Sequence, residues 1–244
     1  MSFESVTIGE FTRGLMSLVF VVVSLIIGIK LMWKYFKYKE KTFITVGLTW
    51  IFLSASWWHS AFNMLSLLFF DTPLNEILGL ILVNAFIAPA LITWMYSFGN
   101  LIYNKYKKEI TIISLVIFGG YEILFFILLI IQPDLIATVL PGNIVQRTVL
   151  TFSFAIISII IAIVAGLIIS LEAIRTENQK IKWKGRFLLL AFALFTVGAL
   201  LDSATWIGLG FIVFIRILLI TSVITYYLGF FLPEWLANIL IHKE

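Results

Sequence analysis

Residues 148–171 read TVLTFSFAIISIIIAIVAGLIISL, a stretch without a charged side chain. It is longer than the roughly 20 apolar residues that a helix needs to cross a hydrocarbon core about 30 Å thick. The next segment, residues 172–186, is rich in lysine and arginine. This change from apolar to basic residues is typical of a membrane span that ends at the cytoplasmic face.

Apolar runs separated by short polar connections recur along all 244 residues. Hydrophobic residues make up 61% of the chain and charged residues 12%, and the mean hydropathy is +1.09, which excludes a soluble enzyme. We predict an all-α membrane protein with a single domain over residues 1–244, a seven-transmembrane-helix bundle. The expected spans are about 11–33, 43–70, 77–103, 110–131, 148–171, 187–207 and 211–231.

The positions of the basic residues predict the orientation of these spans. Alternate connections carry nearly all of them, which places the N-terminus outside and the C-terminus in the cytoplasm of a multi-pass cell-membrane protein. A cleavable signal peptide is not expected, because Glu4 and Glu10 stand where a basic start would be. Pro233 and Trp235 open a short segment that we expect to form an interfacial helix. The basic residues of the inner connections are Lys34, Lys37, Lys39, Lys41, Lys105, Lys107, Lys108, Arg175, Lys180, Lys182, Lys184 and Arg186.

The composition also argues against most cofactors. The chain has no cysteine and two histidines, His59 and His242, so we expect no disulfide, metal site or haem. Retinal is not expected either, because the last expected span, 211–231, contains no lysine to which it could be bound. The net charge of +4 follows from membrane topology and does not indicate nucleic acid. No catalytic motif is present, and we do not expect an enzyme.

Two charged residues near one end of the expected helices 6 and 7 form a candidate pair. Asp202 lies near the outer end of helix 6, and Arg216 lies about a turn into helix 7 from the same side. A short turn around Gly208 and Gly210 would make the two helices antiparallel neighbours. An ion pair would then lower the desolvation cost of both charges. The alternatives are a structural clasp and an anchor for a charged group of a ligand.

Other polar and aromatic residues gather in the outer half of the predicted bundle, whereas the inner half is mainly apolar. Ser56, His59 and Asn63 share one face of helix 2. The pattern predicts an outward-facing, aromatic-lined pocket. Hydrogen bonding between helices is the alternative, and Glu122 could also couple to protons or contact a cation. The candidate ligand-binding residues are His59, Asn63, Asn84, Glu122, Asp202, Arg216, Trp58 and Trp206.

The two halves of the chain show a faint internal similarity. Lys37, Lys39 and Lys41 precede helix 2 with the spacing of the lysines at 180–184 before helix 6. The arrangement would be three helices, a linker helix and three helices, as in some transporters. Such a 3+1+3 pattern resembles sugar transporters of the SWEET type, but their proline-glutamine signature is absent.

A second resemblance comes from the stretch Gly229-Phe230-Phe231-Leu232-Pro233-Glu234-Trp235-Leu236. With the expected architecture, it resembles the seven-transmembrane sensor regions that precede prokaryotic histidine kinases and cyclases. The resemblance implies a small-molecule sensor and transfers no individual binding residue. In those proteins the seventh helix passes into an output module, whereas this sequence ends at Glu244.

These patterns favour a receptor-like membrane sensor. It would bind a small-molecule or lipid ligand in the outer half of the bundle and signal through a separate cytoplasmic or membrane partner. The sequence leaves open a small transporter or ion channel, and a non-catalytic structural subunit of a membrane complex. The expected surroundings are the lipid bilayer, without nucleic acid, and a homo-oligomer is compatible with the sequence.

Overall fold

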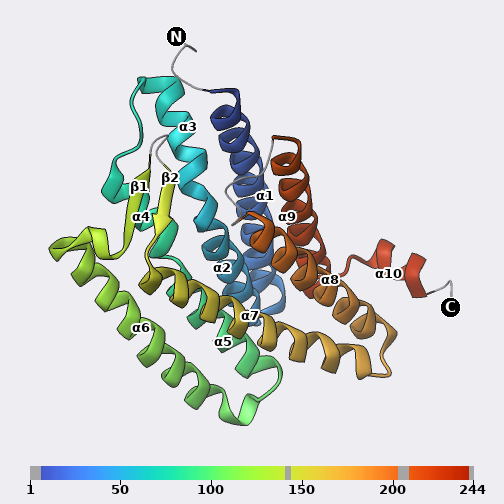
Figure 1. The fold of residues 1–244 in the computed structure, drawn as a ribbon. Coiled ribbons are helices and arrows are strands. Elements are labelled where there is room, and N and C mark those ends of the chain that lie inside the picture. The colour runs from blue at the N-terminus through green and yellow to red at the C-terminus, as the bar shows by residue number, and fades with distance from the viewer. Residues whose placement is uncertain (1–6, 141–143, 203–208, 242–244) are drawn as a thin grey trace.

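A computed structural model describes residues 7–140, 144–202 and 209–241, and most of them are helical (Figure 1). The long helices are α1 (Ile8–Tyr38), α6 (Lys107–Ile131), α7 (Val149–Arg175), α8 (Gln179–Asp202) and α9 (Leu209–Phe230). The shorter elements are α2 (Thr42–Ser54), η2 (Ala55–Trp57), α3 (Trp58–Phe70), α4 (Glu76–Asn84), α5 (Ile87–Leu101), η3 (Asn104–Tyr106), η4 (Pro133–Leu135) and α10 (Glu234–Ile241).

In the described part of the chain, six helical segments are long and apolar enough to cross a membrane. The fold is therefore that of a helical, multi-pass membrane protein. The expected span at 43–70 is not among the six. It consists of α2 and α3 with the 3-10 turn η2 between them, and it carries His59 and Asn63. Seven spans and their orientation stay predictions.

Several helices extend beyond the apolar runs that predicted them. α1 begins at Ile8 because Thr7 and Glu10 form a capping box, and it ends where Lys39 adopts a left-handed conformation with φ 57°. α8 begins at Gln179 and not near 187. Long basic side chains keep their charges in water while the backbone stays helical, so an apolar run underestimates the helix.

A β-hairpin occupies the connection between α6 and α7, for which no strand was predicted. β1 (Ala137–Leu140) and β2 (Ile144–Arg147) are antiparallel, and Ala137 pairs with Arg147. Beneath the hairpin, Ile136 and Phe125 belong to a small buried cluster shared with α4 and α6. The all-α prediction is thus correct for the bundle and wrong for this connection.

Six helices form a ring through successive contacts, in the order α1, α2, α5, α7, α8 and α9, and α9 returns to α1. α3 packs on α1, and α6 lies outside the ring against α5. The hairpin, the end of α3 and the start of α9 lie toward one end, which we call the hairpin end (Figure 1). The opposite end carries the basic connections, and we call it the lysine end.

Two glycines allow a close approach of two helices of the ring, where α1 crosses α2. A Cβ atom added at Gly28 would lie 2.9 Å from the carbonyl oxygen of Gly47, and one added at Gly47 would lie 2.6 Å from that of Gly28. Helices in membranes associate mainly by such close packing of small residues. The buried face of α1 also includes Gly14, Ser17 and Ser24.

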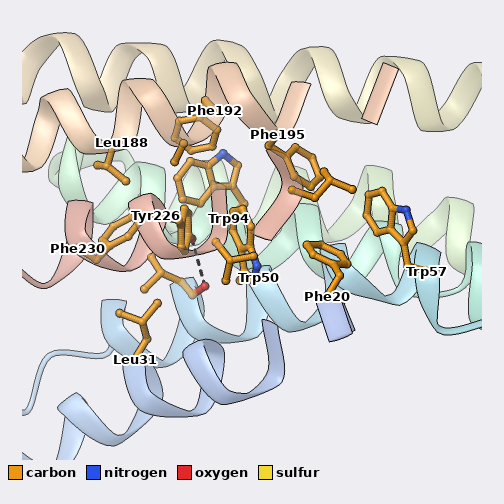
Figure 2. Packing of buried hydrophobic residues seen from close by; sticks show 14 of the residues in the cluster. Phe20, Leu31, Trp50, Trp57, Trp94, Leu188, Phe192, Phe195, Tyr226 and Phe230 are labelled. Atoms are coloured by element: carbon orange, nitrogen blue, oxygen red, sulfur yellow. Dashed lines mark hydrogen bonds between the residues drawn. The ribbon is translucent and has the colours of Figure 1, made fainter. Parts of the chain in front are cut away.

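Aromatic side chains fill the centre of the ring (Figure 2). Trp50 and Tyr226 lie with ring centroids 4.3 Å apart, and Trp94 packs against Phe192 at 5.4 Å. The hydroxyl of Tyr226 donates a hydrogen bond of 3.1 Å to the carbonyl of Val46, drawn as the dashed line in Figure 2. α2, α5, α8 and α9 are therefore joined by one aromatic cluster.

Candidate functional site

Asp202 and Arg216 form the expected ion pair. Nη1 of Arg216 donates to Oδ1 of Asp202 at 2.7 Å, which joins the end of α8 to the first half of α9. The Arg216 side chain is 2% exposed and that of Asp202 is 24% exposed. A cation so deeply buried needs its counter-charge, so the pair stabilises the contact between these helices.

Trp57 is a third member of this group that the sequence did not reveal. Its indole Nε1 donates to Oδ2 of Asp202 at 2.6 Å, and the Arg216 guanidinium lies 5.9 Å from the centre of its ring. Both oxygens of Asp202 are thus occupied. Nε of Arg216 is buried and has no hydrogen-bond acceptor among the described residues. We call Asp202, Arg216 and Trp57 the clasp.

A second polar group joins the hairpin to α4. Nε of Arg147 donates to Oδ1 of Asn84 at 2.9 Å, and Nη2 donates to the carbonyl of Val83 at 2.8 Å. Asn84 is 1% exposed, and its own amide donates to the carbonyl of Leu80. Burial lowers the pKa of the Arg147 guanidinium, because desolvation penalises its charge. An arginine nevertheless stays protonated.

Glu122 lies beyond the middle of α6, toward the hairpin end. Its Oε2 is buried and has no hydrogen-bond donor among the residues that the structure describes. The neighbouring Tyr121 stacks on Phe154 of α7 and lies within electrostatic range of both Arg147 and Glu122. We call Asn84, Tyr121, Glu122 and Arg147 the hairpin-end site.

The two candidate residues of α3, His59 and Asn63, contact other parts of the protein in ways that account for their burial or bonding. Oδ1 of Asn63 accepts from the backbone N–H of Leu74 at 2.9 Å and so positions the connection to α4. The ring of His59 is buried against Gly79, where an added Cβ would lie 2.8 Å from Nδ1. Close packing with α4 thus fixes this histidine.

Of the two tryptophan candidates, Trp58 has defined contacts within the bundle. Nε1 of Trp58 donates to Oγ of Ser54 at 3.1 Å, and its ring packs on Phe62 and Phe86. Trp206 lies outside the described residues. The eight candidates therefore do not converge on one pocket: Asp202 and Arg216 lie in the clasp, and Asn84 and Glu122 in the hairpin-end site.

The lysine half of the bundle is less apolar than expected. Between α2 and α5, Oγ1 of Thr45 lies 2.7 Å from Oγ of Ser97. Nearer the end, Lys107 donates to Asn100, which in turn donates to Thr42 at 2.7 Å. The sequence did not reveal this polar seam, because serine and threonine hydroxyls within an apolar run can also bond to the backbone of their own helix. Their presence alone therefore does not indicate a contact between helices.

A small cavity lies between α2, α5, α7, α8 and α9, with room for about one water molecule. Its lining residues are Thr49, Leu53, Ala90, Leu91, Trp94, Ala162, Phe192 and Tyr226. None of the eight candidate residues lines it. Across the described ranges, no three His, Asp or Glu side chains come close enough to hold a metal ion.

Comparisons with protein-family models, with curated proteins and with solved structures found no match. The class is defined by the fold alone: a helical, multi-pass membrane protein with a ring of six contacting helices.

Proposed function

We propose that this protein is a membrane sensor that binds a small ligand at its hairpin-end site. The observation that carries the proposal is a basic and an acidic group, Arg147 and Glu122, that both lie within electrostatic range of Tyr121 and form no ion pair among the described residues. Arg147 donates to two neutral oxygens, and no described acid forms an ion pair with it. Oε2 of Glu122 has no described donor. An ionisable group within a span, such as Glu122 in α6, is a candidate for function when it lacks a protein partner.

The chemistry of the site suits a ligand with an ammonium group, a carboxylate or both. A carboxylate would accept hydrogen bonds from a guanidinium, and an ammonium group would donate to Glu122. Under the predicted topology the site lies in the outer half of the bundle. A separate cytoplasmic or membrane partner would carry the signal onward.

A thermal-shift screen with alkylammonium ions, carboxylates and amino acids tests this proposal. At least one compound should stabilise the purified protein, and Glu122→Gln or Arg147→Gln should abolish that shift. Glu109→Gln is the matched control, because Glu109 is exposed at the opposite end of α6. If every effective compound acts equally on the control and on the site variants, the proposal fails.

A transporter is the second candidate, and the polar seam between α2 and α5 favours it. A translocation route needs polar groups at both depths, and the seam supplies them in the lysine half. Purified protein in liposomes should then conduct protons, cations or sugars. Reproducible flux that Glu122→Ala abolishes would replace the sensor by the transporter. Co-purification of a partner in mild detergent, with neither ligand nor flux, would instead indicate a structural subunit.

A further inference from the structure

The lysine end of α8 carries a surface with features beyond those that membrane topology demands. Residues 175–186 contain five basic residues and one acidic residue. Lys180, Trp183 and Arg186 follow one another at spacings of three, which places them on one face of the helix. Arg186 lies 4.4 Å from the centre of the Trp183 ring.

The indole N–H of Trp183 is buried and lacks a hydrogen-bond acceptor among the described residues. A buried donor without a partner is costly, so native proteins almost always supply one. Arg186 lies over the same ring and Lys180 lies one turn earlier on the helix, so an acceptor with negative charge suits this donor. The positive-inside bias accounts for the basic residues at this end, but it does not account for a buried indole N–H without an acceptor.

Neighbouring elements place this surface at the level of lipid headgroups. α10 contacts α8, and it exposes Trp235 and Ile239 on one face, with exposed fractions of 65% and 50%. Nζ of Lys34 lies 3.6 Å from the ring centre of Phe231, between α9 and α10. Exposed tryptophan beside basic residues is typical of the membrane–water interface.

We propose that the lysine end of α8, together with α10, binds the headgroup of an anionic phospholipid. The phosphate accepts a hydrogen bond from Trp183, and Lys180 and Arg186 balance its charge. The acyl chains lie against the exposed face of α10. This site is separate from the hairpin-end site and does not depend on it.

The test compares thermal unfolding in lipid discs of phosphatidylcholine alone and of phosphatidylcholine mixed with phosphatidylglycerol. The anionic lipid should raise the unfolding temperature of the wild type, and native mass spectrometry should show it bound. Trp183→Phe should weaken lipid binding about tenfold, as expected for the loss of a hydrogen bond to a charged group. This variant keeps every charge and therefore the topology.

Trp33→Phe is the matched control, because Trp33 is an exposed tryptophan near the same end of α1, and it should bind as the wild type does. Arg186→Gln should lose binding as Trp183→Phe does. Equal binding by Trp183→Phe and the wild type would overturn the proposal. An equal loss of lipid binding in Trp33→Phe would also overturn it, because it would indicate a general surface effect. A rise in the unfolding temperature with inorganic phosphate alone would overturn it as well, because it would indicate a site for free anions.

Discussion

Asp202 shows how far single residues could be predicted from the sequence. Its pairing with Arg216 was predictable and is confirmed, because a short turn makes two successive helices neighbours. Its bond to Trp57 was not predictable, because 145 residues separate the two. Arg147 was missed as a site residue for a similar reason: it stands in a connection, and only the folded hairpin brings it to Asn84.

The clasp predicts non-additive losses of stability. Asp202→Asn leaves the fully buried Arg216 without its counter-charge and should cost about 3 kcal/mol. Arg216→Gln should cost less, because Asp202 is partly exposed and keeps its bond to Trp57. The double variant should lose less than the sum of both. Unfolding temperatures in detergent measure this, and simple addition would show that the two side chains do not interact.

At the scale of elements, the apolar runs predicted the long helices well. Their ends and interruptions depend on individual bonds, such as the capping box at Thr7. The hairpin was missed because its strands have four residues each within a polar connection. The β-branched pairs Thr138-Val139 and Ile144-Val145, on the two sides of the turn-forming residues Pro141-Gly142-Asn143, were the signal that could have revealed it.

The crossing of α1 and α2 should tolerate no added methyl group. Gly28→Ala or Gly47→Ala drives a Cβ into the backbone of the facing helix and should cost about 1–3 kcal/mol. Gly120→Ala is the control, because a Cβ there meets nothing within 4 Å. Thermal unfolding of the three variants in the same detergent provides the comparison. A loss at Gly120 as large as at Gly28 would contradict the packing argument.

Arg147 should determine how firmly the hairpin is held. Arg147→Ala removes its bonds to Asn84 and Val83, so amide exchange in β1 and β2 should accelerate by about tenfold. Gln146→Ala, at an exposed position in the same strand, should leave exchange unchanged. Hydrogen–deuterium exchange with mass spectrometry reads both. Unaltered exchange in Arg147→Ala would show that the apolar cluster below the hairpin suffices.

For the whole molecule, the sequence predicted the six helical segments that are long and apolar enough to cross a membrane, and it could not predict their order in space. Composition and apolar runs indicate spans, whereas the ring results from contacts between distant segments, such as Tyr226 with Val46. The position of α6 outside the ring also follows from packing alone. A single sequence carries little information about such pairs.

The orientation is tested with cysteines introduced into a chain that has none of its own. Thr72→Cys, in the exposed connection before α4, should react with an impermeant maleimide in intact cells. Glu177→Cys, between α7 and α8, should react only after the cells are opened. Glu177 is preferable to its neighbour Asn178, whose side chain accepts from the backbone of Lys180. The reverse pattern of labelling would overturn the predicted topology.

The closure of the ring by α9 on α1 has a consequence for biosynthesis. The first long helix leaves the ribosome with the side that will contact α9 uncovered, because α9 is translated last among the long helices. Until then the buried charge of Arg216 has not yet entered the membrane to meet Asp202 and Trp57. A ribosome that stalls before α9 therefore leaves an open bundle, which quality-control proteases that recognise unassembled helices should degrade.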